Sequence, residues 1–309
     1  MTVTTPLRLS PHVEEALRGG RPVVALESSV LAQGLPVPAN REAARRMFDG
    51  VRVAHAVPAV TALVRGVPAL GLDEEELERF LRRDGVRKVS ARDIPAAMIA
   101  GADGATTVAA SLVLARLAGV EVFATGGIGG VHRDAPFDES ADLLELARTP
   151  MVVVCAGAKS ILDLPATMER LESLGVPVVG YRTSELPGFF TTGTGLPLPA
   201  RVETADEVAA VFRAHLHLGR TTALLVVQPP PPAVALDRAV VERAVAAALV
   251  AAREDGVRGA AVTPYLLAAV ERATEGRSLA TNLALLHANA ALAGHIAAAV
   301  QRSAAGPAW

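Results

Sequence analysis

Short apolar segments alternate with helical patterns along this chain, and that alternation limits its fold more than any other feature. Segments 23–26, 120–124, 151–157 and 223–227 are rich in Val, Ala and Leu and are too short for ordinary helices. The segments between them repeat their apolar residues with the period of a helix. Strands that alternate with helices favour a mainly parallel sheet covered on both faces. Because no internal repeat or real linker interrupts the pattern, we predict an α/β fold with a single domain over residues 1–309.

Composition and charge exclude several classes of protein. Hydrophobic residues make up 51% of the chain but aromatic residues only 3%, so the core must be packed from small aliphatic side chains. A net charge of −2 gives no basis for binding nucleic acid. The single cysteine, Cys155, lies in an apolar segment, where it is expected to be a core residue; no disulfide can form within the chain.

The ends and apolar runs of the chain give no signal for export or membrane insertion. The first ten residues lack a basic stretch followed by an apolar core. The run 244–252 is bounded by arginines and is far shorter than the ~20 residues of a membrane span. We therefore expect a cytoplasmic protein with no membrane partner.

Lysine is almost absent from the chain. Lys88 and Lys159 are the only lysines among 30 basic residues. Arginine stays protonated, whereas a lysine amine that loses its proton can attack a carbonyl carbon and form an imine. We therefore hypothesise that at least one lysine takes part in chemistry. The alternative, that codon bias left two ordinary surface lysines, stays open at this stage.

The glycine loop 126–130 begins the segment in which most candidate functional residues lie. Its spacing does not satisfy G-x-G-x-x-G and no Walker lysine follows, so a dinucleotide or P-loop site is excluded. Backbone N–H groups in such a loop can still bind a phosphate. A tight turn without a ligand explains the glycines equally well.

Acidic residues and a predicted helix start follow the loop. Ser140 is predicted to cap a helix that runs to about residue 148, and a helix N-terminus attracts phosphate, although a plain cap is the simpler explanation. Asp134, Asp138, Glu139 and Asp142 offer hard oxygen ligands that suit Mg²⁺ or Mn²⁺. Acids near helix starts are also commonly just solvated.

Glu27 follows an apolar strand and is a candidate general acid or base. A carboxyl group removed from water has a raised pKa and can hold a proton near neutral pH. The alternative is a glutamate bound to backbone N–H groups at the end of a strand. Lys88, Thr125 and Lys159 also follow predicted strands, so we expect all four residues to meet at the carboxyl edge of the sheet.

Three asparagines belong to predicted helices. We expect Asn40 to cap the helix that follows it. Asn282 and Asn289 share one face of the last helix, where a solvated face is the expected environment. Asn282 could also reach into the site.

Several motifs, in the same order and over about residues 8–300, resemble the pseudouridine-5′-phosphate glycosidase family, which is indigoidine-synthase-A-like. They are ESSVLAQG at 27–34, VRKVS at 86–90, GATTV at 104–108, ATGGIGGVHR at 124–133, SADL at 140–143 and CAGAKS at 155–160. The resemblance implies a three-layer α/β/α fold, a homotrimer and a Mn²⁺-type ion. It also implies reversible cleavage of the C–C glycosidic bond of pseudouridine 5′-phosphate, which gives ribose 5-phosphate and uracil.

The same resemblance implies a role for each matching residue. Lys159 is expected to be the imine-forming nucleophile and Glu27 the proton donor. Asp138 is expected to hold the metal. The expected substrate-binding residues are Lys88, Val108, His132, Ser140, Ala141, Asp142 and Asn282.

These roles agree with the chemistry of a C–C bond. An ordinary glycosidase protonates an oxygen leaving group with one of two carboxylates. A carbon leaving group has no such lone pair, so the sugar must supply the electron sink. Ring opening makes C1′ a carbonyl equivalent, and an imine with a neutral Lys159 can accept the electrons.

The chain departs from the family pattern where loops could touch the aglycone, the group joined to the sugar. Gln33 stands where the family usually has His, Ser29 where it usually has Thr, and Glu139 where it usually has an apolar residue. The second position after residues 88–90 is usually basic in the family, and here Arg92 is preceded by Ala91. The loop between residues 132 and 138 is two residues shorter. We therefore keep an alternative from the same family, a C-glycosynthase that joins ribose 5-phosphate to an aromatic polyketide. A Schiff-base aldolase and a sugar-phosphate sensor without chemistry are further hypotheses.

Overall fold

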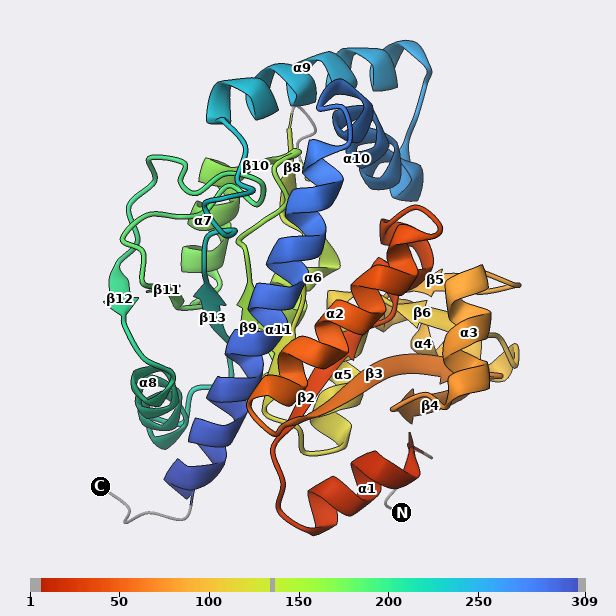
Figure 1. Cartoon of the computed structure of the whole chain (residues 1–309), viewed down its shortest axis with the longest axis vertical. Helices are drawn as coiled ribbons and strands as arrows, with labels where there is room; N and C mark the ends of the chain where they lie inside the picture. The colour runs from red at the N-terminus through yellow and green to blue at the C-terminus, as the bar shows by residue number, and fades with distance from the viewer. Residues whose placement is uncertain (1–6, 134–136, 305–309) are drawn as a thin grey trace.

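The computed structural model of the chain describes residues 7–133 and 137–304, and Figure 1 shows their arrangement. Residues 1–6, part of the segment in which we expect no signal peptide, lie outside the described range. The strands of the main sheet are β1 (Arg8–Leu9), β2 (Val23–Glu27), β3 (Val57–Val64), β4 (Val67–Leu70), β5 (Arg87–Val89), β6 (Gly104–Thr106), β7 (Val122–Ala124), β9 (Val152–Cys155), β11 (Val178–Tyr181), β12 (Ala200–Val202) and β13 (Leu224–Val227). β8 (Val131–His132) and β10 (Leu162–Asp163) form a separate antiparallel pair.

The main sheet is parallel over most of its width. In the described residues its strand order is β1-β4-β3-β2-β7-β9-β13-β11-β12; β6 also pairs with β3, and β5 pairs with β6. Every pairing from β3 across to β12 is parallel, whereas β4 and β6 run antiparallel to β3. The central strands β9 and β13 are fully buried and consist of Val, Leu and Cys, as expected of parallel strands covered on both faces.

Helices form a layer on each side of this sheet. They are α1 (Pro11–Arg18), α2 (Ala39–Val53), α3 (Glu74–Arg82), α4 (Ile94–Ile99), α5 (Val108–Leu117), α6 (Ala141–Leu146), α7 (Leu164–Ser173), α8 (Ala205–His217), α9 (Arg238–Glu254), α10 (Val262–Ala273) and α11 (Arg277–Ala304). Figure 1 shows α2 and α11 side by side across one face, with α5 on the other. The predicted three-layer α/β/α fold is confirmed.

Small residues allow α2 and α11 to approach closely. A methyl group added at Gly50 of α2 would lie 2.7 Å from the carbonyl oxygen of His287, and one added at Gly294 would lie 2.7 Å from that of Val51. The segment Arg277–Ser303 is long and apolar enough by composition to cross a membrane, but 61% of its apolar window is buried within the protein. Its composition is therefore explained by its place between α2, α8 and the sheet.

Two local predictions are wrong. Asn40 does not cap α2 but lies inside its first turn, where its buried amide donates to the carbonyl oxygens of Leu31, at 3.0 Å, and Leu81, at 2.8 Å. Lys88 lies within β5 rather than after it. The amide of Asn40 finds tertiary partners that a sequence pattern cannot show.

Candidate active site

A cavity of about 460 Å³ lies at the carboxyl ends of β2 and β7, under α10. Cavities of this size suit small ligands. Its walls contain every predicted catalytic and substrate-binding residue, namely Glu27, Lys88, Val108, His132, Ser140, Ala141, Asp142, Lys159 and Asn282. Asp138 does not line it. Glu27 and Lys159 therefore meet in the cavity as expected, and Thr125 bonds to Glu27, whereas Lys88 reaches the cavity from within a strand rather than from a strand end.

Glu27 is the last residue of β2, and its side chain is almost fully enclosed, with 5% exposed. One carboxyl oxygen accepts a hydrogen bond from Thr125 Oγ1 at 2.7 Å and the other from Ser29 Oγ at 3.0 Å. Burial raises the pKa of Glu27 above its ordinary value of 4.5, against the opposing effects of Lys159 and the two hydroxyls. Glu27 is therefore a carboxyl group able to keep a proton where ordinary glutamates have lost theirs.

Lys159 follows β9 and reaches into the same cavity. Its Nζ donates to the carbonyl oxygen of Gly127 at 2.8 Å, and its backbone N–H donates to that of Ile128 at 3.1 Å. Both contacts fix the amine against the glycine loop. The pKa of Lys88 is lowered by partial removal from water in the cavity and by the positive charge of Lys159, while Glu27 and Asp142 oppose the shift.

The glycine loop is held against the starts of α5 and α6 by Asp142. The carboxylate of Asp142 accepts from the backbone N–H of Ala109 at 2.9 Å and from that of Gly129 at 2.8 Å. A side chain at Gly127 would lie 2.6 Å from the ring of Phe189. The loop is therefore glycine-rich because other segments pack directly on its backbone.

Ser140 caps α6 as predicted, accepting a hydrogen bond from the backbone N–H of Asp142 at 3.2 Å. Thr107 caps α5 in the same way, accepting from Ala110 at 3.4 Å. Val108, the first residue of α5, lines the cavity, and first-turn N–H groups have no partner within their helix. The positive end of α5 therefore faces the site.

The acidic residues beyond the loop have separate roles. Asp134 lies outside the described residues. Glu139 pairs with Arg170 at 2.8 Å, and both oxygens of Asp142 are occupied by N–H groups. Asp138 is exposed, and its backbone oxygen accepts from the N–H of His132 at 2.9 Å.

The residues of the described ranges do not build a complete metal site. They contain no group of three His, Cys, Asp or Glu side chains placed to hold an ion. The carboxylate of Asp138 supplies one hard oxygen, which fits only an ion that keeps most of its waters, as Mg²⁺-like ions do.

The two asparagines of α11 are buried rather than solvated, so the expectation of a solvated face is wrong. Asn289 is 1% exposed and its amide donates to the carbonyl oxygen of Thr125 at 2.8 Å. Asn282 is 8% exposed and lines the cavity. The face of α11 that carries them packs on the start of the glycine loop.

Cys155 takes no part in the site chemistry. Its side chain is fully buried at the end of β9, and burial raises the pKa of the thiol to about 12. A thiol with so high a pKa stays protonated and is a poor nucleophile. The predicted core role is confirmed.

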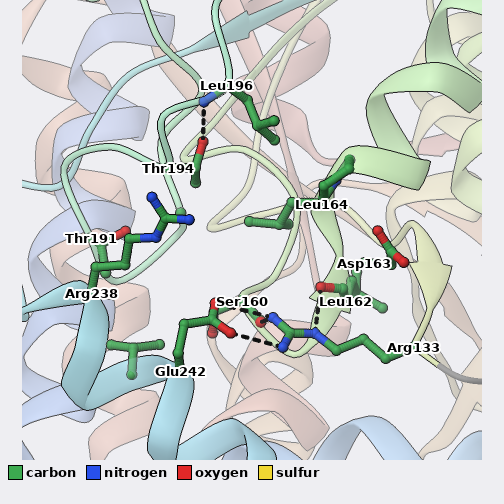
Figure 2. A pocket seen from close by; sticks show the side chains of 13 residues that line it. Arg133, Ser160, Leu162, Asp163, Leu164, Thr191, Thr194, Leu196, Arg238 and Glu242 are labelled. Atoms are coloured by element: carbon green, nitrogen blue, oxygen red, sulfur yellow. Dashed lines mark hydrogen bonds and ion pairs between the residues drawn. The ribbon is translucent and has the colours of Figure 1, made fainter.

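A second cavity, of about 360 Å³, adjoins the first, and Leu162 lines both. Figure 2 shows Arg133 and Glu242 paired in its wall. Arg133 also donates to the carbonyl oxygens of Ser160 and Leu162. Neither lysine nor Glu27 lines this cavity, so the first cavity is the candidate active site.

Comparison with known proteins agrees with this architecture. Residues 12–299 match the family described as indigoidine synthase A like protein. The chain belongs to this family. It is 66% identical over 293 residues to a pseudouridine-5′-phosphate glycosidase of Gemmatimonas aurantiaca, covering 95% of this chain and 96% of that one. It is 52% identical to the protein of the same name from Herpetosiphon aurantiacus, covering 97% and 99%.

Two solved structures of the family share the fold. The prealnumycin C-glycosynthase AlnA, in complex with ribulose 5-phosphate, has a TM-score of 0.90 and 40% identity, covering 97% of this chain and 98% of that one. An indigoidine synthase A-like protein from Thermotoga maritima has a TM-score of 0.89 and 37% identity, covering 98% and 99%.

Sequence reasoning missed part of the cavity wall. Phe189 reaches the site from a loop after β11, and Ala261, Thr263, Pro264 and Leu267 reach it from α10 and the turn before it. Nothing in their local sequence distinguishes them from ordinary core residues. Gln33 and Ser29 also line the cavity, but the sequence singled them out only because they differ from the residues usual in the family.

Proposed function

We propose that the protein reversibly cleaves the C–C glycosidic bond of pseudouridine 5′-phosphate, taking up water and giving uracil and ribose 5-phosphate. The observation that carries the proposal is the meeting of Lys159 and the buried Glu27 in one cavity. The 66% identity to a protein named for this activity supports it. The enzyme is then a C-glycosidase of the lyase type.

In the cleavage direction, the neutral Lys159 amine bonds to C1′ as the ring bond between C1′ and O4′ breaks, and the proton that the amine loses passes to O4′. Glu27 gives its proton to C5 of the base as the C1′–C5 bond breaks, and the bonding electrons stay with the base. C1′ is left as an imine with Lys159. Water hydrolyses this imine, which frees the amine and leaves C1 of ribose 5-phosphate as an aldehyde.

The surroundings of Glu27 suit an acid. Burial raises its pKa, which favours the protonated form that an acid in this role needs before the bond breaks. The contact of Lys159 Nζ with the carbonyl oxygen of Gly127 fixes the amine beside the cavity. We propose that Lys88 and the start of α5 at Val108 bind the phosphate, and that His132 and residues 140–142 bind the sugar.

Three further features belong to the proposal. Asp138 is proposed to bind a largely hydrated Mn²⁺, whose chemistry when bound is to order water and anionic oxygens near the site. The protein is proposed to act as a homotrimer. It is proposed to work in the cytoplasm, consistent with one cysteine that is buried and free.

Trapping the imine tests the proposal. Reduction with borohydride in the presence of ribose 5-phosphate should add a stable mass to the peptide that contains Lys159. Lys159→Arg, which keeps the charge but cannot form an imine, should abolish the adduct and lower kcat by at least about 10³-fold. Lys88→Arg is the matched control, because it should retain the Lys159 adduct.

The outcomes separate the competing hypotheses. An adduct only at Lys88, or none at all, contradicts the proposal. A Schiff-base aldolase would form the adduct but would keep its activity in Glu27→Gln. A sensor without chemistry would bind the sugar phosphate unchanged in Lys159→Arg.

A C-glycosynthase that attaches ribose 5-phosphate to an aromatic acceptor is the second candidate. The TM-score of 0.90 to the prealnumycin C-glycosynthase favours it, but the identity of 40% is lower than the 66% to the glycosidase-named relative. Incubating the protein with ribose 5-phosphate, Mn²⁺ and uracil, and measuring pseudouridine 5′-phosphate, distinguishes the two.

A further inference from the structure

The two oxygens of the Glu27 carboxyl group have different surroundings. Oε1 accepts a hydrogen bond from Thr125 Oγ1 at 2.7 Å, and Oε2 accepts one from Ser29 Oγ at 3.0 Å. Thr125 is 1% exposed and does not line the cavity, whereas Ser29 is partly exposed and lines it. One oxygen is therefore bonded to a hydroxyl inside the protein, and the other to a hydroxyl on the cavity wall.

The backbone of Thr125 is held by segments that are distant in sequence. The amide of Asn289 in α11 donates to the carbonyl oxygens of Thr125 at 2.8 Å and Gly126 at 3.3 Å, and its Oδ1 accepts from Gln228 Nε2 at 3.0 Å. The N–H of Thr125 donates to the carbonyl oxygen of Val154 in β9 at 3.0 Å. The Thr125 hydroxyl therefore has a fixed position beside Oε1.

These contacts determine which oxygen can hold the proton. A protonated carboxyl oxygen carries an O–H donor, and the hydroxyl at hydrogen-bond distance is its nearest acceptor. If Thr125 accepted this hydrogen bond, its own buried hydrogen would have no acceptor among the described residues, which is costly. Ser29 can accept it, because its own hydrogen can then turn into the cavity. The proton therefore belongs on Oε2, beside Ser29.

The proposed reaction uses this proton once in each turnover, so it must be returned. Glu27 becomes a carboxylate when its proton goes to C5 of the base, and a protonated imine is left on Lys159. Water then adds its oxygen to C1′ and gives up one proton. The resulting carbinolamine collapses to the aldehyde and the neutral amine with no further net loss of protons. The proton from the water is therefore the one that Glu27 must regain.

We propose that Ser29 is a catalytic residue that returns this proton to Glu27. Its hydroxyl takes the proton from the hydrolytic water while it gives its own hydrogen to Oε2. Ser29 ends the step as a hydroxyl again, and Glu27 ends it as a carboxylic acid. Thr125 is a positioning residue, which keeps Oε1 in place so that Oε2 stays beside Ser29. This inference rests on the proposed function and assigns the residue that completes its cycle.

Ser29→Ala and Thr125→Val form a matched pair, because each removes one hydroxyl from the same carboxyl group. Rapid-quench measurement of uracil released from pseudouridine 5′-phosphate gives both the first-turnover rate constant and kcat. In Ser29→Ala the first-turnover rate constant should stay within about threefold of wild type, because Glu27 starts with its proton, and kcat should fall by about 10²-fold. A burst of about one uracil per active site should precede the slow phase.

Thr125→Val should behave differently. Loss of the fixed hydroxyl misplaces the carboxyl group that donates the proton, so the first-turnover rate constant and kcat should fall together, without a burst. Ser29→Thr restores a hydroxyl and should bring the ratio of the two constants back to within about threefold of wild type. An inactive fraction of enzyme cannot imitate the result for Ser29→Ala, because it lowers kcat without producing a burst.

The imine gives an independent measurement. Because its hydrolysis is slowed in Ser29→Ala, borohydride added during turnover should label at least about threefold more Lys159 than in wild type.

The two proposals fail in different ways. The inference about Ser29 is overturned if both rate constants of Ser29→Ala fall together or neither changes, if Thr125→Val gives the same burst, or if Ser29→Thr keeps it. The imine chemistry stands in each of these cases. If no adduct forms at Lys159 of the wild-type protein, the proposed function itself is wrong.

Discussion

The surroundings of Glu27 shift the pKa of its carboxyl group in two opposite directions. Burial disfavours the charged form, while Lys159, Thr125 and Ser29 favour it. Burial is the largest of these effects and the pKa is raised. The proposed role of Glu27 as a proton donor therefore comes at a cost to stability, because the folded protein must either hold the proton or bury a charge.

Replacing Glu27 by Gln should change how stability depends on pH. From the ordinary pKa of 4.5 up to the raised value, the unfolded chain has lost this proton and the folded chain keeps it. The free energy of unfolding therefore falls as pH rises through that window. Glu27→Gln cannot ionise, so its Tm relative to wild type should increase as pH rises from about 5 toward the raised pKa of Glu27.

Glu42→Gln is the control for this series. The arginines Arg45 and Arg46 lower the pKa of Glu42 to about 2, so Glu42 is ionised in both states over the tested range. Its Tm difference from wild type should stay constant there. A constant difference for Glu27→Gln as well would contradict the raised pKa.

At the scale of elements, the glycine loop between β7 and β8 depends on what packs against it. Asp142 binds the backbone N–H of Gly129, and Ser140 lies directly against the same glycine. A methyl group at Gly129 would lie 2.9 Å from a carboxyl oxygen of Asp142. The loop, α6 and the carboxylate are therefore one unit.

Gly129→Ala should disrupt this unit while the main sheet stays folded. The added methyl group must push the loop away from Ser140 and Asp142, so the increase in Tm produced by ribose 5-phosphate should largely disappear. Gly126→Ala is the matched control, because its nearest contacts are the ends of Leu285 and Leu286 at 3.3 Å, which can shift. Equal ligand effects in both variants would show that the loop contact does not shape the site. Thermal unfolding with and without the sugar phosphate measures this.

At the scale of the whole molecule, the parallel sheet brings together residues that are far apart in sequence. Glu27 and Lys159 end up in one cavity because β2, β7 and β9 lie side by side and run the same way. The last two helices then complete the site, since α10 covers it and Asn282 of α11 enters its wall. Truncation before α10 would therefore remove one side of the cavity.

The proposed homotrimer is a prediction at this scale. Sedimentation equilibrium should give a mass three times that of the 31.9 kDa chain. The value should not change between the wild-type protein and Lys159→Arg, because that residue lines the cavity rather than an outer surface. A single-chain mass at all concentrations would contradict the assembly.

The sequence by itself determined the layers of the fold, the carboxyl edge as the place of the site, and most of its residues. Alternating strands and helices allow few other folds, and the scarce lysines beside motifs gave the hypothesis of imine chemistry without coordinates. Only the tertiary structure decided the roles of the amides and acids. Asn40, Asn282 and Asn289 have similar local sequence settings, yet one ties α2 to its neighbours, one is unpaired in the cavity and one holds a loop. Hydrogen-bond partners come from distant segments, and their distances are set by packing that no local pattern contains.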